Sequence, residues 1–277
     1  MYTLNCKGKL LVIDKPLLMG ILNITPDSFY EGHLDKNIES IAQLASNMLA
    51  DGADILDIGG QSTRPGSKRI TAVEEIKRVL PVIEAIKKNH PDAIISIDTY
   101  YSNVAFESVK AGASIVNDIS AGNMDSKMLD TVAALQVPFI AMHCKGRPET
   151  MQENPQYDDV VKEVLDFFIQ KIDDCKKAGI TDIVIDPGFG FGKTIQHNFQ
   201  LLKNLQTFRM LEKPILAGIS RKGTIYKTLN VTAAEALNGT TCLNTIALLN
   251  GACILRVHDI KEAKEVVELF YTYHKQT

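Results

Sequence analysis

The sequence predicts an α/β fold, a (β/α)8 TIM barrel with a short N-terminal β-hairpin. Apolar, β-branched runs of strand length alternate regularly with amphipathic segments of helix length, and the pattern gives eight strand–helix units. The strand-like runs are almost continuously apolar, which is typical of parallel strands covered on both faces. The chain of 277 residues has about the usual size of one such barrel, and no linker divides it. We therefore expect a single domain, residues 1–277. An open doubly wound sheet is the alternative, but it rarely has eight regular units.

Each element follows from its local pattern. Two apolar segments, near Leu4 and at residues 10–13, flank Lys7-Gly8-Lys9 and predict the hairpin. Apolar runs predict the barrel strands at residues 17–23, 54–58, 94–98, 114–117, 137–143, 182–186, 214–219 and 253–257. Helical spacing of apolar residues predicts helices near residues 38–50, 72–88, 104–110, 126–135, 161–175, 233–249 and 261–273. A glycine precedes four of the strands and is expected to cap the preceding helix, at Gly52, Gly112, Gly179 and Gly251.

Composition argues against several classes of protein. The formal net charge is −3, so neither nucleic acid nor an anionic membrane is expected as the main partner. The five cysteines are odd in number and lack Cys-x-x-Cys spacing, which argues against a disulfide framework and against structural zinc. The N-terminus has no secretory signal pattern, and no apolar run is long enough to cross a bilayer. We expect a cytoplasmic protein.

Polar residues gather where the predicted strands end, and the active site of a (β/α)8 barrel lies at these carboxyl ends. One such residue alone is most often a satisfied hydrogen-bonding group, but nine on one rim indicate a site. They are Asn23, Asp57, Asp98, Asn117, His143, Asp186, Lys222, Arg256 and His258.

The acceptors in this set suit a flat heterocycle that has an amidine-like N–H edge. Asp98 and Asp186 can each accept two parallel N–H bonds, and the Asn117 amide can accept another. Met142 and Phe191 are suited to cover the faces of the ring.

The remaining residues predict an anionic group at the other end of the ligand. Lys222, Arg256, His258 and Arg64 supply positive charge, and the amide oxygen of Asn23 suits a hard cation such as Mg²⁺, which usually binds through phosphates. No Cys or Ser is paired with a base at motif spacing, so covalent catalysis is not indicated.

The stretch from Asp186 to Lys193 combines a strand end with a glycine-rich loop. Gly188, Gly190 and Gly192 alternate with phenylalanines, so the backbone can approach a ligand closely. A phosphate-binding P-loop needs four residues between its first glycine and the Gly-Lys pair, whereas this stretch has three. The Asp186 carboxylate would also repel a phosphate, so we reject a P-loop.

Two loops after strands, residues 24–33 and 59–66, combine Gly, Pro and Ser/Thr with charged residues. They have the composition of ordinary turns, but their place over the mouth of the barrel suggests lids.

Eight segments, in order along nearly the whole chain, resemble those of dihydropteroate synthase of folate biosynthesis. They are NITPDSF at 23–29, STRPG at 62–66, SIDT at 96–99, NDI at 117–119, MH at 142–143, DPGFGFGK at 186–193, SRK at 220–222 and RVHD at 256–259. The resemblance implies a transferase that joins (7,8-dihydropterin-6-yl)methyl diphosphate to 4-aminobenzoate, giving 7,8-dihydropteroate and diphosphate. It also implies a homodimer and a target for sulfonamides, which mimic 4-aminobenzoate.

The resemblance also assigns roles to residues. Asp98, Asn117, Asp186 and Lys222 would hold the pterin, and Met142 and Phe191 would line its site. Asn23, Arg256 and His258 would hold the diphosphate with Mg²⁺, and Thr63 and Arg64 would belong to a closing loop. Catalysis would fall to Asp98, Asp186, Lys222, Arg256 and His258. In the family the diphosphate departs first, and the arylamine then attacks a cationic pterin.

The chain departs from the family pattern at four places. Residues 30–33 read Tyr-Glu-Gly-His where Ser-Asp-Gly-Gly is usual, and Gln61 replaces Glu. Cys144 replaces Met after the Met-His pair, and Gly223 replaces a Ser that is associated with the aminobenzoate carboxylate. The pterin half of the site is therefore better supported than the aminobenzoate half.

Two other functions share an acidic pterin pocket. A pterin-binding methyltransferase barrel, which presents methyltetrahydrofolate to a corrinoid partner, has less need of the Arg256 and His258 anion site. A non-enzymatic pterin-binding protein that has lost aminobenzoate recognition is suggested by Gly223 alone.

Overall fold

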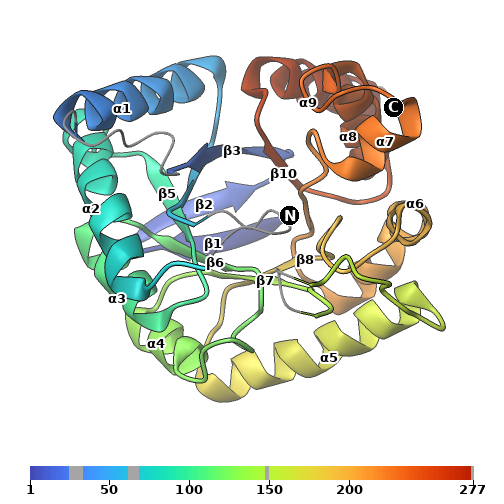
Figure 1. Ribbon diagram of the computed structural model, residues 1–277, viewed down its shortest axis with the longest axis horizontal. Helices are drawn as coiled ribbons and strands as arrows, with labels where there is room; N and C mark the ends of the chain where they lie inside the picture. The colour runs from blue at the N-terminus through green and yellow to red at the C-terminus, as the bar shows by residue number, and fades with distance from the viewer. Residues whose placement is uncertain (25–33, 62–68, 147–149, 276–277) are drawn as a thin grey trace.

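The computed structural model of the chain describes residues 1–24, 34–61, 69–146 and 150–275. Eight parallel strands form the central sheet in the order β8-β7-β6-β5-β4-β3-β10-β9, and helices surround them (Figure 1). A bridge between Ile185 and Ile215 joins β8 to the segment that leads into β9, so the sheet closes on itself. The predicted barrel and its N-terminal hairpin are both confirmed.

Most barrel strands coincide with the predicted ones to within two residues. Their bounds are β3 (Leu17–Asn23), β4 (Ile55–Gly59), β5 (Ile94–Asp98), β6 (Ile115–Asp118), β7 (Phe139–Met142), β8 (Ile183–Asp186), β9 (Leu216–Ala217) and β10 (Ile254–Val257). β9 differs most from its predicted range, because it has two residues where six were predicted at 214–219. Pro214 has no N–H for a ladder hydrogen bond, and Pro138 shortens β7 in the same way.

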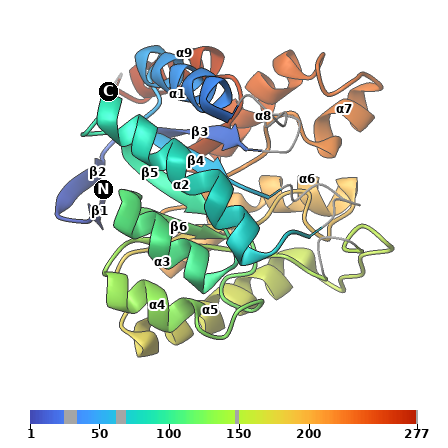
Figure 2. The same ribbon diagram turned by 60° about the vertical axis from the view of Figure 1, so that its left-hand side comes forward.

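The hairpin covers one end of the barrel (Figure 2). Its strands β1 (Tyr2–Cys6) and β2 (Lys9–Ile13) are antiparallel, and Tyr2 pairs with Ile13. The hairpin contributes three side chains to a buried apolar layer. Each barrel strand begins with a member of that layer, except β7 and β8, which reach it at their second residue. The layer consists of Leu4, Cys6, Ile13, Leu17, Met19, Ile55, Ile94, Ile115, Ile140, Val184, Leu216 and Ile254.

The next inward-facing position along each strand lies two residues further on, because side chains alternate across a strand. These positions are largely polar: Ile55 is followed by Asp57, Ile94 by Ser96, and Ile254 by Arg256. The barrel interior therefore has an apolar floor at the hairpin end and a polar layer at the carboxyl end. This polar layer forms the base of the site.

The helices largely follow the expected order. Their bounds are α1 (Leu34–Asp51), α2 (Ala72–Asn89), α3 (Ser102–Ala111), α4 (Met128–Leu135), α5 (Val160–Ala178), α6 (Ile195–Lys203), the 3-10 helix η2 (Leu205–Leu211), α7 (Gly223–Leu229), α8 (Leu237–Leu249) and α9 (Ile260–Lys275). The four glycines expected to cap helices all have positive φ, at Gly52, Gly112, Gly179 and Gly251. No helix among the described residues has both the length and the apolar character needed to cross a membrane.

Two parts of the helical pattern differ from the prediction. α6, η2 and α7 match none of the predicted helix ranges, although Thr194 gives α6 a capping box with His197. α8 begins at Leu237 instead of near Ala233, because the carbonyls of Ala233 and Ala234 accept hydrogen bonds from the Arg221 guanidinium instead of from helical amides.

Candidate active site

The register of the barrel strands brings the predicted pterin residues together at the carboxyl end. Asp98 in β5 is paired with Asn117 in β6, and Met142 in β7 is paired with Asp186 in β8. Asn117, Met142 and Asp186 are buried, and the Asp98 side chain is 12% exposed. The acceptor-rich group expected from the sequence is therefore a real cluster of side chains.

Arg256 connects this cluster to a residue to which the sequence assigned no role. Its Nη2 lies 2.7 Å from Asp98 Oδ2, and its Nε lies 2.5 Å from Asp57 Oδ2. Asp57 is fully buried, and its Oδ2 also accepts a 3.0 Å hydrogen bond from Asn117 Nδ2. One carboxylate thus supports a predicted pterin residue and a predicted diphosphate residue at once.

The charges in this network shift the pKa values of its members. Burial raises the pKa of Asp98 to about 7. The positive charge of Arg256 opposes this increase, and the neighbouring Asp57 carboxylate adds to it. Burial alone would lower the pKa of Arg256, but Asp57 and Asp98 raise it above its usual range. Burial also raises the pKa of Asp186, against the opposing charge of Lys222. Groups with N–H donors or positive charge would therefore be stabilised beside these carboxyls.

Lys222 brings a positive charge close to Asp186. Its Nζ donates to the Phe189 carbonyl at 2.6 Å and lies 4.5 Å from the centre of the Phe191 ring. A Cβ on Gly218 would lie 3.7 Å from Lys222 Nζ and 3.8 Å from Asp186 Oδ2, so both charged groups border the space above this glycine. Burial lowers the pKa of Lys222 to about 8, although Asp186 opposes the shift.

The turn that presents Lys222 is fixed by Arg221. The Arg221 guanidinium makes two hydrogen bonds of 2.8 Å to the Asp259 carboxylate. Arg221 has a φ of +53°, a conformation that costs energy for a residue with a side chain. The paired hydrogen bonds hold that conformation, and Lys222 then occupies the N-cap position of α7, with its side chain directed to the Phe189 carbonyl.

Phe191 and Met142 belong to an apolar cluster beside the polar layer. The buried members of the cluster are Tyr100, Ile119, Met142, Met151 and Phe191. The two residues predicted to cover a ring are therefore on the same apolar surface next to Asp186.

His258 and Asn23, the other residues expected at the diphosphate end, lie after β10 and at the end of β3. His258 Nδ1 is 3.0 Å from Ser220 Oγ, and desolvation together with the charge of Arg256 lowers its pKa to about 4. His258 is therefore neutral near pH 7 and offers hydrogen bonds instead of charge. Asn23 Oδ1 and Asp98 Oδ2 each lie 3.7 Å from the position of a Cβ on Gly59.

The donor set around Asn23 fits a magnesium ion that keeps most of its coordination for the ligand and water. In the ranges that the structure describes, no three His, Cys, Asp or Glu side chains come together in a way that could hold a metal ion. A single exposed amide oxygen close to an anion site matches the way Mg²⁺ binds through substrate phosphates.

Some expectations from the sequence lie elsewhere or cannot be placed. His143 was expected on the rim, but its ring lies beneath the loop after β8, where its Nδ1 is 2.9 Å from Lys193 Nζ. His143 follows β7 directly, and its N–H bonds the Asp186 carbonyl, so the ring is carried under the loop. Thr63, Arg64 and most of both expected lids lie outside the described residues.

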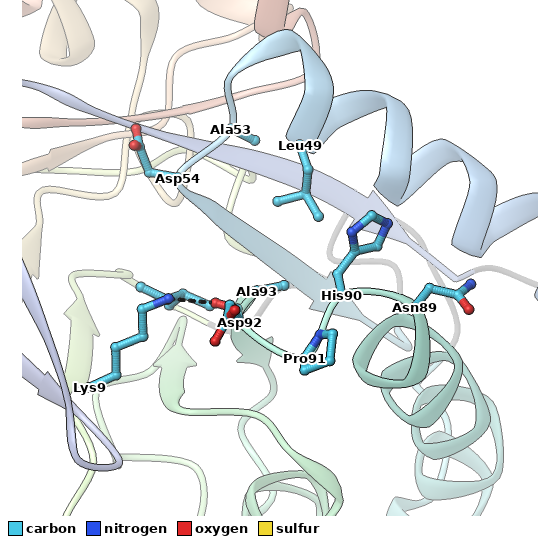
Figure 3. A pocket seen from close by; sticks show the side chains of 10 residues that line it. Lys9, Leu49, Ala53, Asp54, Asn89, His90, Pro91, Asp92 and Ala93 are labelled. Atoms are coloured by element: carbon cyan, nitrogen blue, oxygen red, sulfur yellow. Dashed lines mark hydrogen bonds between the residues drawn. The ribbon is translucent and has the colours of Figure 1, made fainter.

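A cavity of 430 Å³ lies at the other end of the barrel (Figure 3). It is lined by the loop between α2 and β5, including His90 and Asp92, and by Lys9 of the hairpin. Lys9 Nζ donates to the Asp92 carbonyl at 2.8 Å. The amino-terminal end of a (β/α)8 barrel generally serves stability, so we place the active site at the carboxyl end.

Comparison with known proteins identifies the family. A family model described as "Pterin binding enzyme" matches residues 19–258, from β3 to the residue after β10. The dihydropteroate synthase of Escherichia coli K12 is 43% identical over 265 residues, which cover 95% of this chain and 93% of that protein. The chain belongs to the dihydropteroate synthase family.

Solved structures of the family have the same fold. A dihydropteroate synthase of Yersinia pestis, in complex with a sulfonamide drug, superposes with a TM-score of 0.92 at 40% identity and 99% coverage of both chains. One from Xanthomonas albilineans, in complex with 7,8-dihydropteroate, gives a TM-score of 0.89 at 35% identity and full coverage of both chains.

Two departures from the family pattern are accommodated by local contacts. The Gln61 amide donates to the Tyr100 hydroxyl, and its Oε1 accepts from the Ile70 N–H at 3.1 Å. Cys144 packs with its Sγ 3.8 Å from Met151 Sδ. Gly223 is the first residue of α7, where the family usually has Ser.

Proposed function

We propose that this protein is a dihydropteroate synthase. It joins (7,8-dihydropterin-6-yl)methyl diphosphate to 4-aminobenzoate and releases 7,8-dihydropteroate and diphosphate. The observation that carries the proposal is the cluster of Asp98, Asn117 and Asp186 next to Arg256 and Lys222 in a chain of this family. These residues bring hydrogen-bond acceptors for a pterin close to positively charged side chains for a diphosphate.

The acceptor half of the site would hold the pterin ring. Asp186 and Asp98 accept N–H bonds from the ring edge, and Asn117, fixed by Asp57, adds an amide. Phe191 and Met142 cover the ring. Buried carboxyls with raised pKa values stabilise positive charge as it develops on the pterin.

The other half of the site would stabilise the leaving group. Arg256 and His258 bind diphosphate oxygens, and Asn23 would hold Mg²⁺ through its Oδ1. When bound, Mg²⁺ would neutralise part of the negative charge of the diphosphate. Thr63 and Arg64 of the 62–66 loop are proposed to close over this end.

The reaction breaks the bond between the pterin methylene carbon and a diphosphate oxygen, and that oxygen keeps the electron pair. The lone pair of the aminobenzoate nitrogen then forms the C–N bond, and one amine proton is released. Because a neutral arylamine is already a nucleophile, no strong base is required. The protein contributes by holding both substrates in line and by stabilising opposite charges at the two ends.

We also propose that the protein is a cytoplasmic homodimer. The exposed apolar side chains of Leu229, Ile246 and Leu249 on α7 and α8 support an interface there. The five cysteines are all unpaired, as expected in a reducing compartment. Sedimentation equilibrium tests the dimer, and a monomer at micromolar concentration would contradict it.

The proposed activity is tested by incubating the protein with pterin diphosphate and Mg²⁺, with and without 4-aminobenzoate. We expect diphosphate release to become steady turnover only when 4-aminobenzoate is present, with matching formation of dihydropteroate. Release that is independent of 4-aminobenzoate, with no dihydropteroate formed, would contradict a synthase.

A further inference from the structure

Lys193 is a buried lysine whose hydrogen-bond partners are all uncharged, and burial lowers its pKa to about 7. It is 2% exposed, and in the part of the chain that the structure describes no carboxylate forms an ion pair with it. Its Nζ donates to the carbonyls of Gly188 at 3.0 Å, Phe191 at 3.1 Å and His143 at 3.2 Å. His143 Nδ1 is a fourth acceptor at 2.9 Å. A buried ammonium is tolerated only when such acceptors replace water.

His143 provides this acceptor because its imidazole is neutral. Burial and the Lys193 charge lower the pKa of His143 to about 2. Its backbone N–H donates to the Asp186 carbonyl at 2.9 Å, and its ring meets Phe167 edge-on at 4.9 Å. The imidazole is therefore fixed at the end of β7, directly under the loop that follows β8.

The loop from Gly188 to Gly192 has no room for side chains at its two ends. A Cβ on Gly188 would lie 1.9 Å from the His143 carbonyl oxygen, and one on Gly192 would lie 2.1 Å from that of Lys145. Both glycines have positive φ, at +69° and +63°. This loop therefore packs its backbone directly on the segment after β7.

Every carbonyl of the loop has a hydrogen-bond donor. Lys193 binds the carbonyls of Gly188 and Phe191, and the other three are bound by different side chains. The donors are Lys222 to Phe189 at 2.6 Å, Gln152 to Gly190, and Tyr157 to Gly192 at 3.0 Å. Lys193 alone binds two of the five and reaches both ends of the turn that carries Phe191.

We propose that Lys193, held by His143, is a positioning residue that fixes the Gly188–Gly192 loop and thereby sets Phe191 and Lys222 in the pterin half of the site. The contact of these two residues with the pterin rests on the proposed function, whereas the order of the loop can be measured without it. Phe191 and Lys222 both depend on this loop, because the Lys222 ammonium binds its Phe189 carbonyl and lies over the Phe191 ring. The loop also touches Asp186, whose Oδ1 accepts a hydrogen bond of 2.7 Å from the Gly188 N–H, whereas Asp98 and Asn117 come from other strands.

The test uses Lys193→Met, which keeps the side-chain length but removes the donor. The matched control is Lys171→Met, because Lys171 is also buried, at 8% exposure, and binds Asn123 Oδ1 at 3.0 Å in the segment between β6 and α4. A second pair of variants is His143→Asn, which retains an acceptor near the Nδ1 position, and His143→Leu, which does not. The readouts are amide hydrogen exchange in residues 188–192, the Kd of bare pterin, and the KM and kcat with 4-aminobenzoate.

Lys193→Met and His143→Leu should increase exchange in the loop and raise the Kd of bare pterin, each by about tenfold, the effect of losing one good hydrogen bond to a charged group, and kcat/KM for 4-aminobenzoate should fall as well. Lys171→Met and His143→Asn should resemble the wild type. An unchanged Kd of bare pterin, or unchanged loop exchange in both variants, would overturn the proposal. If the wild type had no synthase activity, the exchange measurement would still decide whether Lys193 fixes the loop.

Discussion

Asp57 Oδ2 lies 2.5 Å from Arg256 Nε, although the two residues are 199 positions apart in the chain. The pair joins β4 to β10 across the barrel interior. The same oxygen accepts from Asn117 Nδ2, so Asp57 couples the two halves of the site. Its full burial means that each of these contacts is made without competition from water.

Asp57→Ala should therefore both destabilise the protein and reduce its activity. Removing one partner of a buried ion pair costs about 3–5 kcal/mol, and the remaining contact of Arg256 with Asp98 places the expected loss near the lower end. Urea unfolding and steady-state kinetics measure the two effects. The control is Glu268→Ala, which breaks an exposed pair with Lys264 and should change neither quantity measurably. Unchanged stability in Asp57→Ala would show that the network does not support the barrel.

The raised pKa of Asp98 predicts how stability depends on pH. Its pKa is about 7 in the folded protein, against an ordinary value of 3.8. Between these values the folded state binds more protons than the unfolded state, so the contribution of Asp98 is fully present below pH 3.8 and is lost as the pH rises through 7.

Unfolding of the wild type and of Asp98→Asn, compared from pH 5 to pH 8, isolates this contribution. Asp118 and Glu75 also have raised pKa values, so only the difference between the two proteins is informative. We expect the wild type to lose stability relative to Asp98→Asn as the pH rises. A difference that is constant over this range would mean that Asp98 is ionised throughout.

Gly223→Ser should lower the KM for 4-aminobenzoate several-fold. A Cβ at this position would lie 3.5 Å from the Tyr226 hydroxyl, which is an ordinary contact, so the serine of the family fits without strain. A neutral donor to a carboxylate contributes about 1.5–3 kcal/mol when well placed. Steady-state kinetics on Gly223→Ser and Thr224→Val check this. If only Thr224→Val changes the KM, the threonine hydroxyl already serves the carboxylate; if neither does, this turn does not bind it.

Local sequence pattern predicted the barrel because each strand is buried on both faces. The expected strands at Leu17–Asn23 and Ile94–Asp98 coincide with β3 and β5 because their apolar runs stop at the polar strand end. The pattern was less informative where proline interrupts a ladder, as at Pro214. It also missed α6, whose buried face includes the polar Asn198.

The expectation that the site lies at the carboxyl ends of the strands located the site residues. It could not give their hydrogen-bond and ion-pair partners. Asp57 and Arg256 were both expected on the rim, yet their contact depends on the closure of the barrel. Lys193 was considered only as part of a P-loop, because a lysine that binds carbonyls and a neutral imidazole has no signature in local sequence. His143 lies at the carboxyl end of β7 as expected, but its contact with Lys193 could not be predicted for the same reason.

In the proposed site, one half binds the pterin ring and the other binds the diphosphate. Calorimetric titration of bare pterin and of pterin diphosphate into Asp186→Ala and His258→Ala distinguishes the two halves. Asp186→Ala should raise the Kd of both ligands by at least about tenfold, because it removes N–H bonds to a carboxylate. His258→Ala should raise the Kd of pterin diphosphate alone. If His258→Ala weakens both ligands equally, or Asp186→Ala leaves bare pterin unaffected, the division of the site is contradicted.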